Sequence, residues 1–189
     1  MAIVTINNSP VHSDIILTYP YGVPDSGYTC GFHTGVDFAP YGTTERNPVL
    51  YPVKKGRVVY INTTTTPALG VQAQILDEEG HYWRYCHMVQ GSLQVSVGDE
   101  VDLNSPIGRM GATGNVTGIH LHLECSTTQN WKCSTFVNPC DIIGIPNVDN
   151  TIIKYNGSID PPDPPEPVNY PKTNFKWILY TNKLRKKRR

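Results

Sequence analysis

Two histidines separated by one leucine stand in the segment T-G-I-H-L-H-L-E at residues 117–124. Apolar and polar residues alternate through this segment, which predicts a β-strand whose successive side chains point to opposite faces. His120 and His122 should therefore share one face, with Leu121 and Leu123 on the other. Two neighbouring imidazoles can be packed strand residues, a pair that transfers protons, or part of a metal site.

A second segment with metal-binding residue types is G-F-H-T-G-V-D-F-A-P, residues 31–40. His33 and Asp37 are four apart, but the glycines, the valine and the proline disfavour a helix, so we expect His33 on a loop and Asp37 at the start of a strand. A catalytic zinc site takes three ligands of the His, Asp, Glu or Cys type and leaves one position open. These two residues and one of the paired histidines could supply that set, leaving the other histidine free for proton transfer.

Strand signals surround both segments. Residues 71–88 form two strand-like runs around a D-E-E-G turn, which predicts a β-hairpin. His81, Trp83, Tyr85 and His87 should share one face of its second strand.

Short runs of this kind continue along the chain, with two more strands predicted within residues 48–61 around a Lys-Lys-Gly turn. The 189 residues include 16 Gly and 16 Pro, and only 17% are charged. This composition favours a loop-rich, mainly β protein over a helical one. We therefore predict a single antiparallel β-sheet domain over residues 1–145.

The composition changes after residue 145. We expect residues 146–168 to form a linker, Pro-rich and extended at 161–167, followed by an aromatic and basic tail at 169–189. The tail is either a solvated end or an anchor for a partner or a membrane surface. Half of the 16 Lys and Arg lie between Lys172 and Arg189 although the formal net charge is zero, so the body is acidic. We predict no nucleic-acid partner.

The five cysteines are Cys30, Cys86, Cys125, Cys133 and Cys140, and none forms a C-x-x-C pair. That pattern argues against a zinc ribbon or a thioredoxin-like motif. Cys125 and Cys133 could pair in an oxidising setting, whereas burial of most of the cysteines as small hydrophobes is the favoured interpretation.

The first ten residues lack the charged and apolar regions of a signal peptide, and no stretch has the roughly 18 apolar residues of a membrane span. We expect neither a signal peptide nor a transmembrane segment.

Five segments of the chain resemble, in order, the pattern of the lysostaphin-type (LytM-like) zinc endopeptidases, which cut peptide bonds in bacterial peptidoglycan. They are G-F-H-T-G-V-D from Gly31, Y-C-H from Tyr85, V-S-V-G-D-E-V from Val95, I-G-R-M-G-A-T-G from Ile107 and H-L-H-L-E from His120. Together they span roughly residues 30 to 125.

The resemblance implies the lysostaphin-type peptidase fold and one Zn²⁺ per chain, with His33, Asp37 and His122 as metal ligands. It also implies that His87 and His120 are catalytic. One of these two would act as general base on a zinc-bound water, and the other would stabilise the oxyanion or pass a proton to the leaving amine. The sequence leaves the division of these two roles open.

Ile119 departs from the family pattern, which commonly has proline before this histidine. No departure from the pattern falls on a ligand position. We therefore expect the departures to affect substrate fit rather than catalytic competence. Glu124 could orient a ligand imidazole or be a plain surface carboxylate. Asp25, Tyr28 and Trp131 could line a substrate groove.

The sequence thus predicts a zinc-dependent endopeptidase acting on the cross-bridge or stem peptide of peptidoglycan. Without a signal peptide, we expect a bacteriophage protein, either a tail-associated hydrolase that contacts other phage tail proteins through its C-terminal tail, or a lysin. It would then be found in the virion tail or be released at lysis. The alternative is a non-enzymatic structural tail protein, or an activator of other hydrolases, with a vestigial site.

Overall fold

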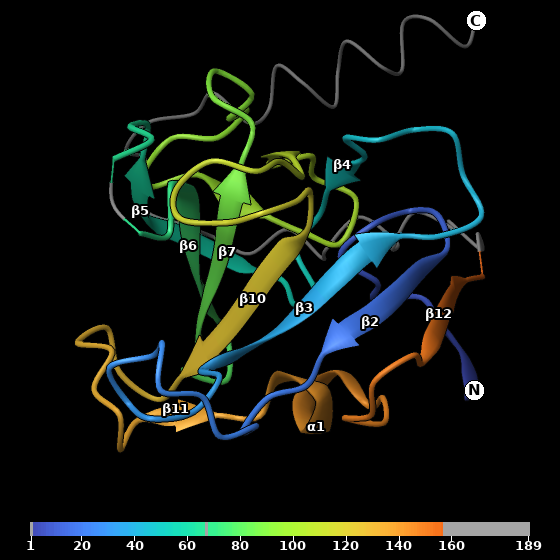
Figure 1. Cartoon of the computed structure of the whole chain (residues 1–189). Helices are drawn as coiled ribbons and strands as arrows, with labels where there is room; N and C mark the ends of the chain where they lie inside the picture. Colours follow the sequence, from blue (N-terminus) through green and yellow to red (C-terminus); the bar gives the residue numbers. More distant parts are fainter. Residues whose placement is uncertain (1, 67, 157–189) are drawn as a thin grey trace, which may run out of the picture. The chain divides into compact units, whose positions relative to one another are not determined.

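A ten-stranded sheet organises the part of the chain that the computed structural model describes, residues 2–66 and 68–156 (Figure 1). Its strand order is β1-β12-β2-β3-β10-β7-β6-β5-β8, with β11 beside β10, and β4 and β9 form a separate pair. The elements are β1 Ile3–Ile6, β2 Ile15–Tyr19, β3 Gly35–Pro40, β4 Val49–Leu50, β5 Gly56–Asn62, β6 Val71–Asp77, β7 Tyr82–Met88, β8 Glu100–Val101, β9 Gly108–Arg109, β10 Leu121–Ser126, β11 Phe136–Val137, α1 Pro139–Ile143 and β12 Ile152–Tyr155. The predicted mainly β, largely antiparallel fold is confirmed.

The predicted hairpin is formed by β6 and β7, which pair antiparallel. Asp77 closes its turn, because Oδ1 accepts the backbone N–H groups of Glu79 and His81 at 2.9 and 2.8 Å. The other carboxylate oxygen accepts the indole N–H of Trp83 at 2.8 Å. One buried carboxylate therefore fixes both the turn and the first core residue of β7.

Alternation along β10 divides the central sheet into an apolar and a polar face. Leu121 and Leu123 are fully buried in the core and stand opposite Phe38 and Val36 of β3. Burial of each such side chain stabilises the fold by about 1.5–3 kcal/mol. The same packing holds β3 and β10 in one register, so the residues between these leucines must point to the other face.

The sheet continues past residue 145, which the sequence suggested as the end of the domain. Within the segment predicted as a linker, β12 pairs in parallel with β1 and antiparallel with β2. Ile152 and Ile153 are buried there, which explains why this part belongs to the sheet and is not a linker. The Pro-rich stretch at 161–167 and the tail at 169–189 lie outside the described residues.

Cys30 is bonded to Cys133, so the suggested pairing of Cys133 with Cys125 is wrong. Cys125 lies on the core face of β10 and cannot reach the exposed Cys133. Cys86, Cys125 and Cys140 are free and buried, which confirms the interpretation of most cysteines as small core residues.

The helix α1 has five residues. Over the described ranges, the structure has no helix that is long and apolar enough to span a membrane.

Candidate active site

Antiparallel pairing of β3 with β10 sets Asp37 directly opposite His122 on the polar face of the sheet. Oδ1 of Asp37 lies 2.8 Å from Nδ1 of His122. His33 lies on the loop just before β3. Its Nε2 is 3.0 Å from Nδ1 of His122 and 3.2 Å from Oδ1 of Asp37. The structure therefore brings together the three residues that the sequence suggested as metal ligands.

The second nitrogen of each imidazole indicates which nitrogen carries the proton. His33 Nδ1 lies 2.8 Å from the carbonyl oxygen of Pro20, and a carbonyl can only accept, so Nδ1 is the donor and Nε2 has the lone pair. His122 Nδ1 lies against two acceptors, His33 Nε2 and Asp37 Oδ1, so without a metal it carries a proton. Once that proton leaves, two nitrogen lone pairs and one carboxylate oxygen converge on one point.

This donor set fits a catalytic zinc site. Two imidazoles and one carboxylate are the residue types that such sites use, with a fourth position left for water or substrate. Tetrahedral ligands at zinc bond lengths lie roughly 3.3 Å apart. The three atoms are within 2.8–3.2 Å of one another, so small movements would accommodate the ion.

Strong electrostatic coupling marks the cluster. Burial alone would lower the pKa of His122, but hydrogen bonds and the negative charges of Asp37 and Glu124 outweigh it and raise that pKa to about 9. Burial would raise the pKa of Asp37, yet the hydrogen bonds from His122 and His33 bring it well below its usual value. Without a metal, the cluster therefore holds a proton on His122.

Zinc binding should consequently release a proton. Since the folded-state pKa of His122 lies above its ordinary value, the imidazolium is favoured below about pH 9, and a metal must displace that proton. We expect Zn²⁺ affinity to rise about tenfold per pH unit between roughly pH 6.5 and 8. Calorimetry in buffers of different ionisation enthalpy counts the protons released, and pH-independent binding would contradict this prediction.

His87 reaches the same site through an irregularity in β7. The pairing of β6 with β7 shifts register between Val71 and Ala73, and His87 has a positive φ of 59°. Regular alternation would have placed His87 with Tyr85 on the core face, so the predicted shared face is wrong at this residue. The bulge turns the imidazole towards the polar face, with its ring centroid 4.8 Å from that of His120.

His87 and His120 are both oriented as proton acceptors. Each presents Nδ1 to a backbone carbonyl, that of Thr113 at 2.8 Å and that of Gly118 at 3.0 Å, so each leaves a lone pair on Nε2. Burial lowers the pKa of His87 to about 4. Nε2 of His120 lies 3.8 Å from Oδ2 of Asp37, which puts this half-buried ring at the edge of the cluster.

Two glycines of the sequence motifs allow these close approaches. A Cβ at Gly35 would lie 2.6 Å from the Leu123 carbonyl oxygen and 2.8 Å from Cε1 of His122. A Cβ at Gly111 would lie 2.7 Å from the carbonyl oxygen of His87. Any larger residue at either position would push the strands or loops that hold the histidines apart.

Aromatic rings line one side of the cluster. Tyr19 stacks on His33 with ring centroids 4.4 Å apart, and Tyr28 meets the same ring edge-on at 5.1 Å. The Tyr19 hydroxyl donates to Asp25 at 3.0 Å. Of the suggested groove residues, Tyr28 thus lies beside the candidate ligands and Asp25 holds Tyr19, which no sequence motif had singled out.

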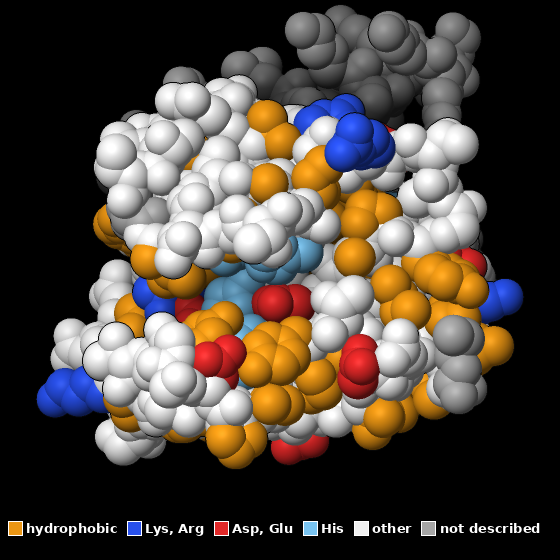
Figure 2. Space-filling view, viewed as in Figure 1, with side chains coloured by type: hydrophobic (Ala, Val, Ile, Leu, Met, Phe, Trp, Pro, Cys, Tyr) orange, Lys and Arg blue, Asp and Glu red, His pale blue; other side chains and the backbone are white. Residues whose placement is uncertain are grey.

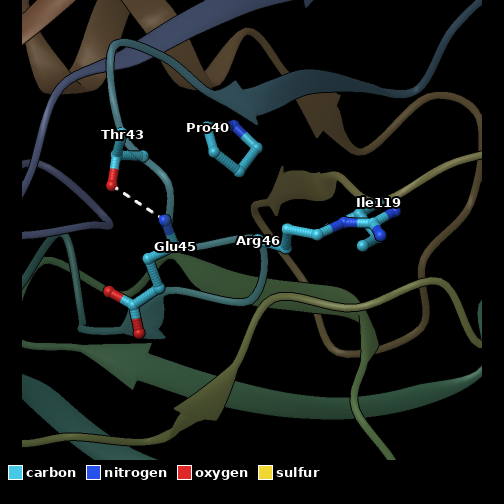
Figure 3. A pocket seen from close by; sticks show the side chains of 5 residues that line it. All are labelled: Pro40, Thr43, Glu45, Arg46 and Ile119. Carbon is cyan, nitrogen blue, oxygen red and sulfur yellow. Dashed lines mark hydrogen bonds between the residues drawn. The ribbon is translucent and has the colours of Figure 1, made fainter.

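The cluster opens to the surface. Figure 2 shows histidine side chains and an acidic side chain gathered in a hollow in the middle of one face. A separate pocket is lined by Pro40, Thr43, Glu45, Arg46 and Ile119 (Figure 3). Ile119, at the departure from the family pattern, lines this pocket and directly precedes His120.

Comparison with known families matches residues 31–135 to the model described as Peptidase family M23. The chain belongs to peptidase family M23. The matched range holds all five residues of the site. An uncharacterized metalloprotease of Buchnera aphidicola subsp. Baizongia pistaciae is 32% identical to this M23 peptidase over 108 residues, which cover 57% of the chain but only 25% of that relative.

Solved structures share the fold of this M23 peptidase. The catalytic domain of the antimicrobial peptidase lysostaphin from Staphylococcus simulans has 28% identity and a TM-score of 0.56, covering 68% of this chain and 91% of that one. The catalytic domain of the prophage-encoded M23 protein EnpA from Enterococcus faecalis has 27% identity and a TM-score of 0.53. The match covers 66% of this chain and 88% of that one. The likeness to lysostaphin confirms the predicted fold class.

Proposed function

We propose that this chain is a zinc-dependent endopeptidase that hydrolyses peptide bonds in bacterial peptidoglycan. The observation that carries the proposal is the convergence of His33 Nε2, Asp37 Oδ1 and His122 Nδ1 within 3.2 Å of one another, in a member of a metallopeptidase family. The similarity to lysostaphin, an antimicrobial peptidase, supports the bacterial cell wall as the substrate.

In this proposal one zinc ion is held by His33, Asp37 and His122. Bound there, zinc supplies a Lewis acid for the scissile carbonyl and lowers the pKa of a water molecule towards neutrality. The carbonyl of Pro20 and the carboxylate of Glu124 keep the two imidazoles turned with their lone pairs towards the ion.

His87 and His120 are the proposed proton-transfer pair. Their rings adjoin, and each has a free Nε2 lone pair because its Nδ1–H donates to a carbonyl. One of them accepts the proton of the attacking water and can then return it to the leaving amine. Burial lowers the pKa of His87 and keeps it neutral near pH 7, so it stays available as an acceptor.

We also propose a bacteriophage setting, in the virion tail or released at lysis to act on the host wall. The similarity to a prophage-encoded protein supports it. Contact with other tail proteins would involve residues 169–189, which lie outside the described part of the chain.

Release of new amino groups from purified peptidoglycan tests the enzymatic proposal. Walls with different cross-bridges are incubated with the protein, with and without a zinc chelator. We expect release from at least one wall type that the chelator abolishes and added Zn²⁺ restores, because the proposed site depends on the ion. Absence of release from every wall by zinc-loaded protein would contradict the proposal and favour a structural or activating role.

A further inference from the structure

The carboxylate of Glu124 is enclosed by hydrogen-bond donors. The hydroxyl of Thr34 donates to Oε1 at 2.6 Å, and the guanidinium of Arg84 donates to Oε2. On the third side, Nε2 of His122 faces Oε1 at 3.2 Å, an ion-pair contact not aligned as a hydrogen bond. Because all three neighbours present N–H or O–H groups, only an acceptor without protons fits between them.

This arrangement is deeply buried. The side chain of Glu124 is 2% exposed and that of Arg84 is 12% exposed. A buried ion pair adds little net stability, because desolvation of the two charges offsets their attraction, and apolar residues often replace such a pair without loss. Stability alone therefore does not account for an ion pair placed against His122.

Arg84 is itself held from the opposite side. The ring of Trp131 covers the guanidinium, with Cζ 3.9 Å from the ring centroid, and the indole N–H donates to Gln74 at 3.1 Å. Arg84 and Gln74 are cross-strand neighbours on β7 and β6. Trp131 thus clamps Arg84 against Glu124 and keeps water away from the ion pair.

The two histidines of the cluster differ in how their outer nitrogens are held. His33 donates to a backbone carbonyl, which no substitution at Pro20 removes. His122 depends on the carboxylate of one side chain, and the Arg84 guanidinium holds that carboxylate in place. The orientation of His122, unlike that of His33, therefore depends on side chains that are not candidate ligands.

We propose that Glu124 and Arg84 are positioning residues for His122, which fix its lone pair on Nδ1 in the direction of the metal, and that Trp131 locks Arg84 in this role. The inference rests on the proposed function, since it presumes that His122 binds zinc. It adds three residues that lie outside the cluster of candidate ligands.

Zn²⁺ affinity, measured by competition with a chromophoric chelator, tests the proposal on the full chain. The Glu124→Gln variant keeps the shape of the side chain but places an amide N–H₂ against one of the donors that surround it. We therefore expect Zn²⁺ binding to weaken by roughly 10–100-fold. Arg84→Met should weaken binding similarly, and Arg84→Lys should recover part of the loss. The visible absorption bands of bound Co²⁺ should change in Glu124→Gln, because they report ligand geometry.

A matched control is Lys54→Met, which breaks the exposed ion pair of Lys54 with Glu79 and should leave affinity unchanged. The half-buried Trp131→Ala variant should fold and weaken binding in the same direction, which keeps the test informative if Arg84→Met is unstable. Unfolding midpoints of the metal-free variants separate binding from stability.

Zn²⁺ affinities within twofold of wild type in both Glu124→Gln and Trp131→Ala would overturn the positioning role, even if those variants were less stable. If the wild-type protein bound no Zn²⁺, the proposed function itself would fail and the positioning role with it.

Discussion

Replacing His122 by alanine is expected to abolish zinc binding and peptidoglycan hydrolysis together, whereas His120→Ala should lose turnover and keep the metal. The difference follows from geometry. Nδ1 of His122 lies within 3.0 Å of both His33 Nε2 and Asp37 Oδ1, whereas Nε2 of His120 lies 3.8 Å from Oδ2 of Asp37. Loss of a general acid or base costs about 10²–10⁴-fold in rate, and we expect His120→Ala to fall in that range.

Zinc content by mass spectrometry and amine release from peptidoglycan provide the two measurements. The control is His12→Ala, because His12 lies between Tyr51 and Tyr155 and away from the cluster, and it should retain both properties. A zinc-free His120→Ala protein, or a fully active one, would show that the proton-transfer role is wrongly assigned.

Loss of the Cys30–Cys133 disulfide should destabilise the protein by about 3 kcal/mol. The bond joins residues 103 positions apart, and closing a loop of this length removes much conformational freedom from the unfolded chain. For a domain of this size, such a loss lowers the melting temperature by about 6–12 °C. Because Cys133 is exposed, a soluble thiol should reach the bond and produce the same shift in the wild-type protein.

Thermal unfolding of wild type and Cys133→Ser, each with and without reductant, checks this expectation. Cys133→Ser should have a lower melting temperature that reductant does not change. The neighbouring Ser134→Ala should have the melting behaviour of wild type. A reductant shift that persists in Cys133→Ser would assign the effect to other thiols and refute the prediction.

The alternation of His120, Leu121, His122 and Leu123 was enough to predict the strand and its two faces. The reason is physical: one apolar face must be buried, which fixes the register and sends the intervening residues to the other side. No local pattern shows which distant strands pair. That His33 and Asp37 lie beside this strand was predicted only from the family resemblance of the five segments in order.

Other features depend on tertiary structure and were missed. The bulge at His87, where φ is positive, breaks the alternation that the sequence shows, and no local pattern marks the position of a bulge. The partner of Cys133 depends on which loops meet in space. The role of Arg84 becomes visible only when its strand lies beside that of Glu124, for nothing in the hairpin sequence distinguishes it from a surface arginine.

The separation of the candidate ligands along the chain links metal occupancy to folding. His33 and Asp37 lie 89 and 85 positions from His122, so the cluster exists only after β3 and β10 have paired. An ion that binds the native state alone adds about 2.7 kcal/mol at a free concentration 100 times its dissociation constant. In zinc-poor surroundings the population of folded chains would fall, and unfolded molecules would have no local nucleus at which to recapture the ion. Zinc supply would then set part of the free energy that separates folded from unfolded molecules.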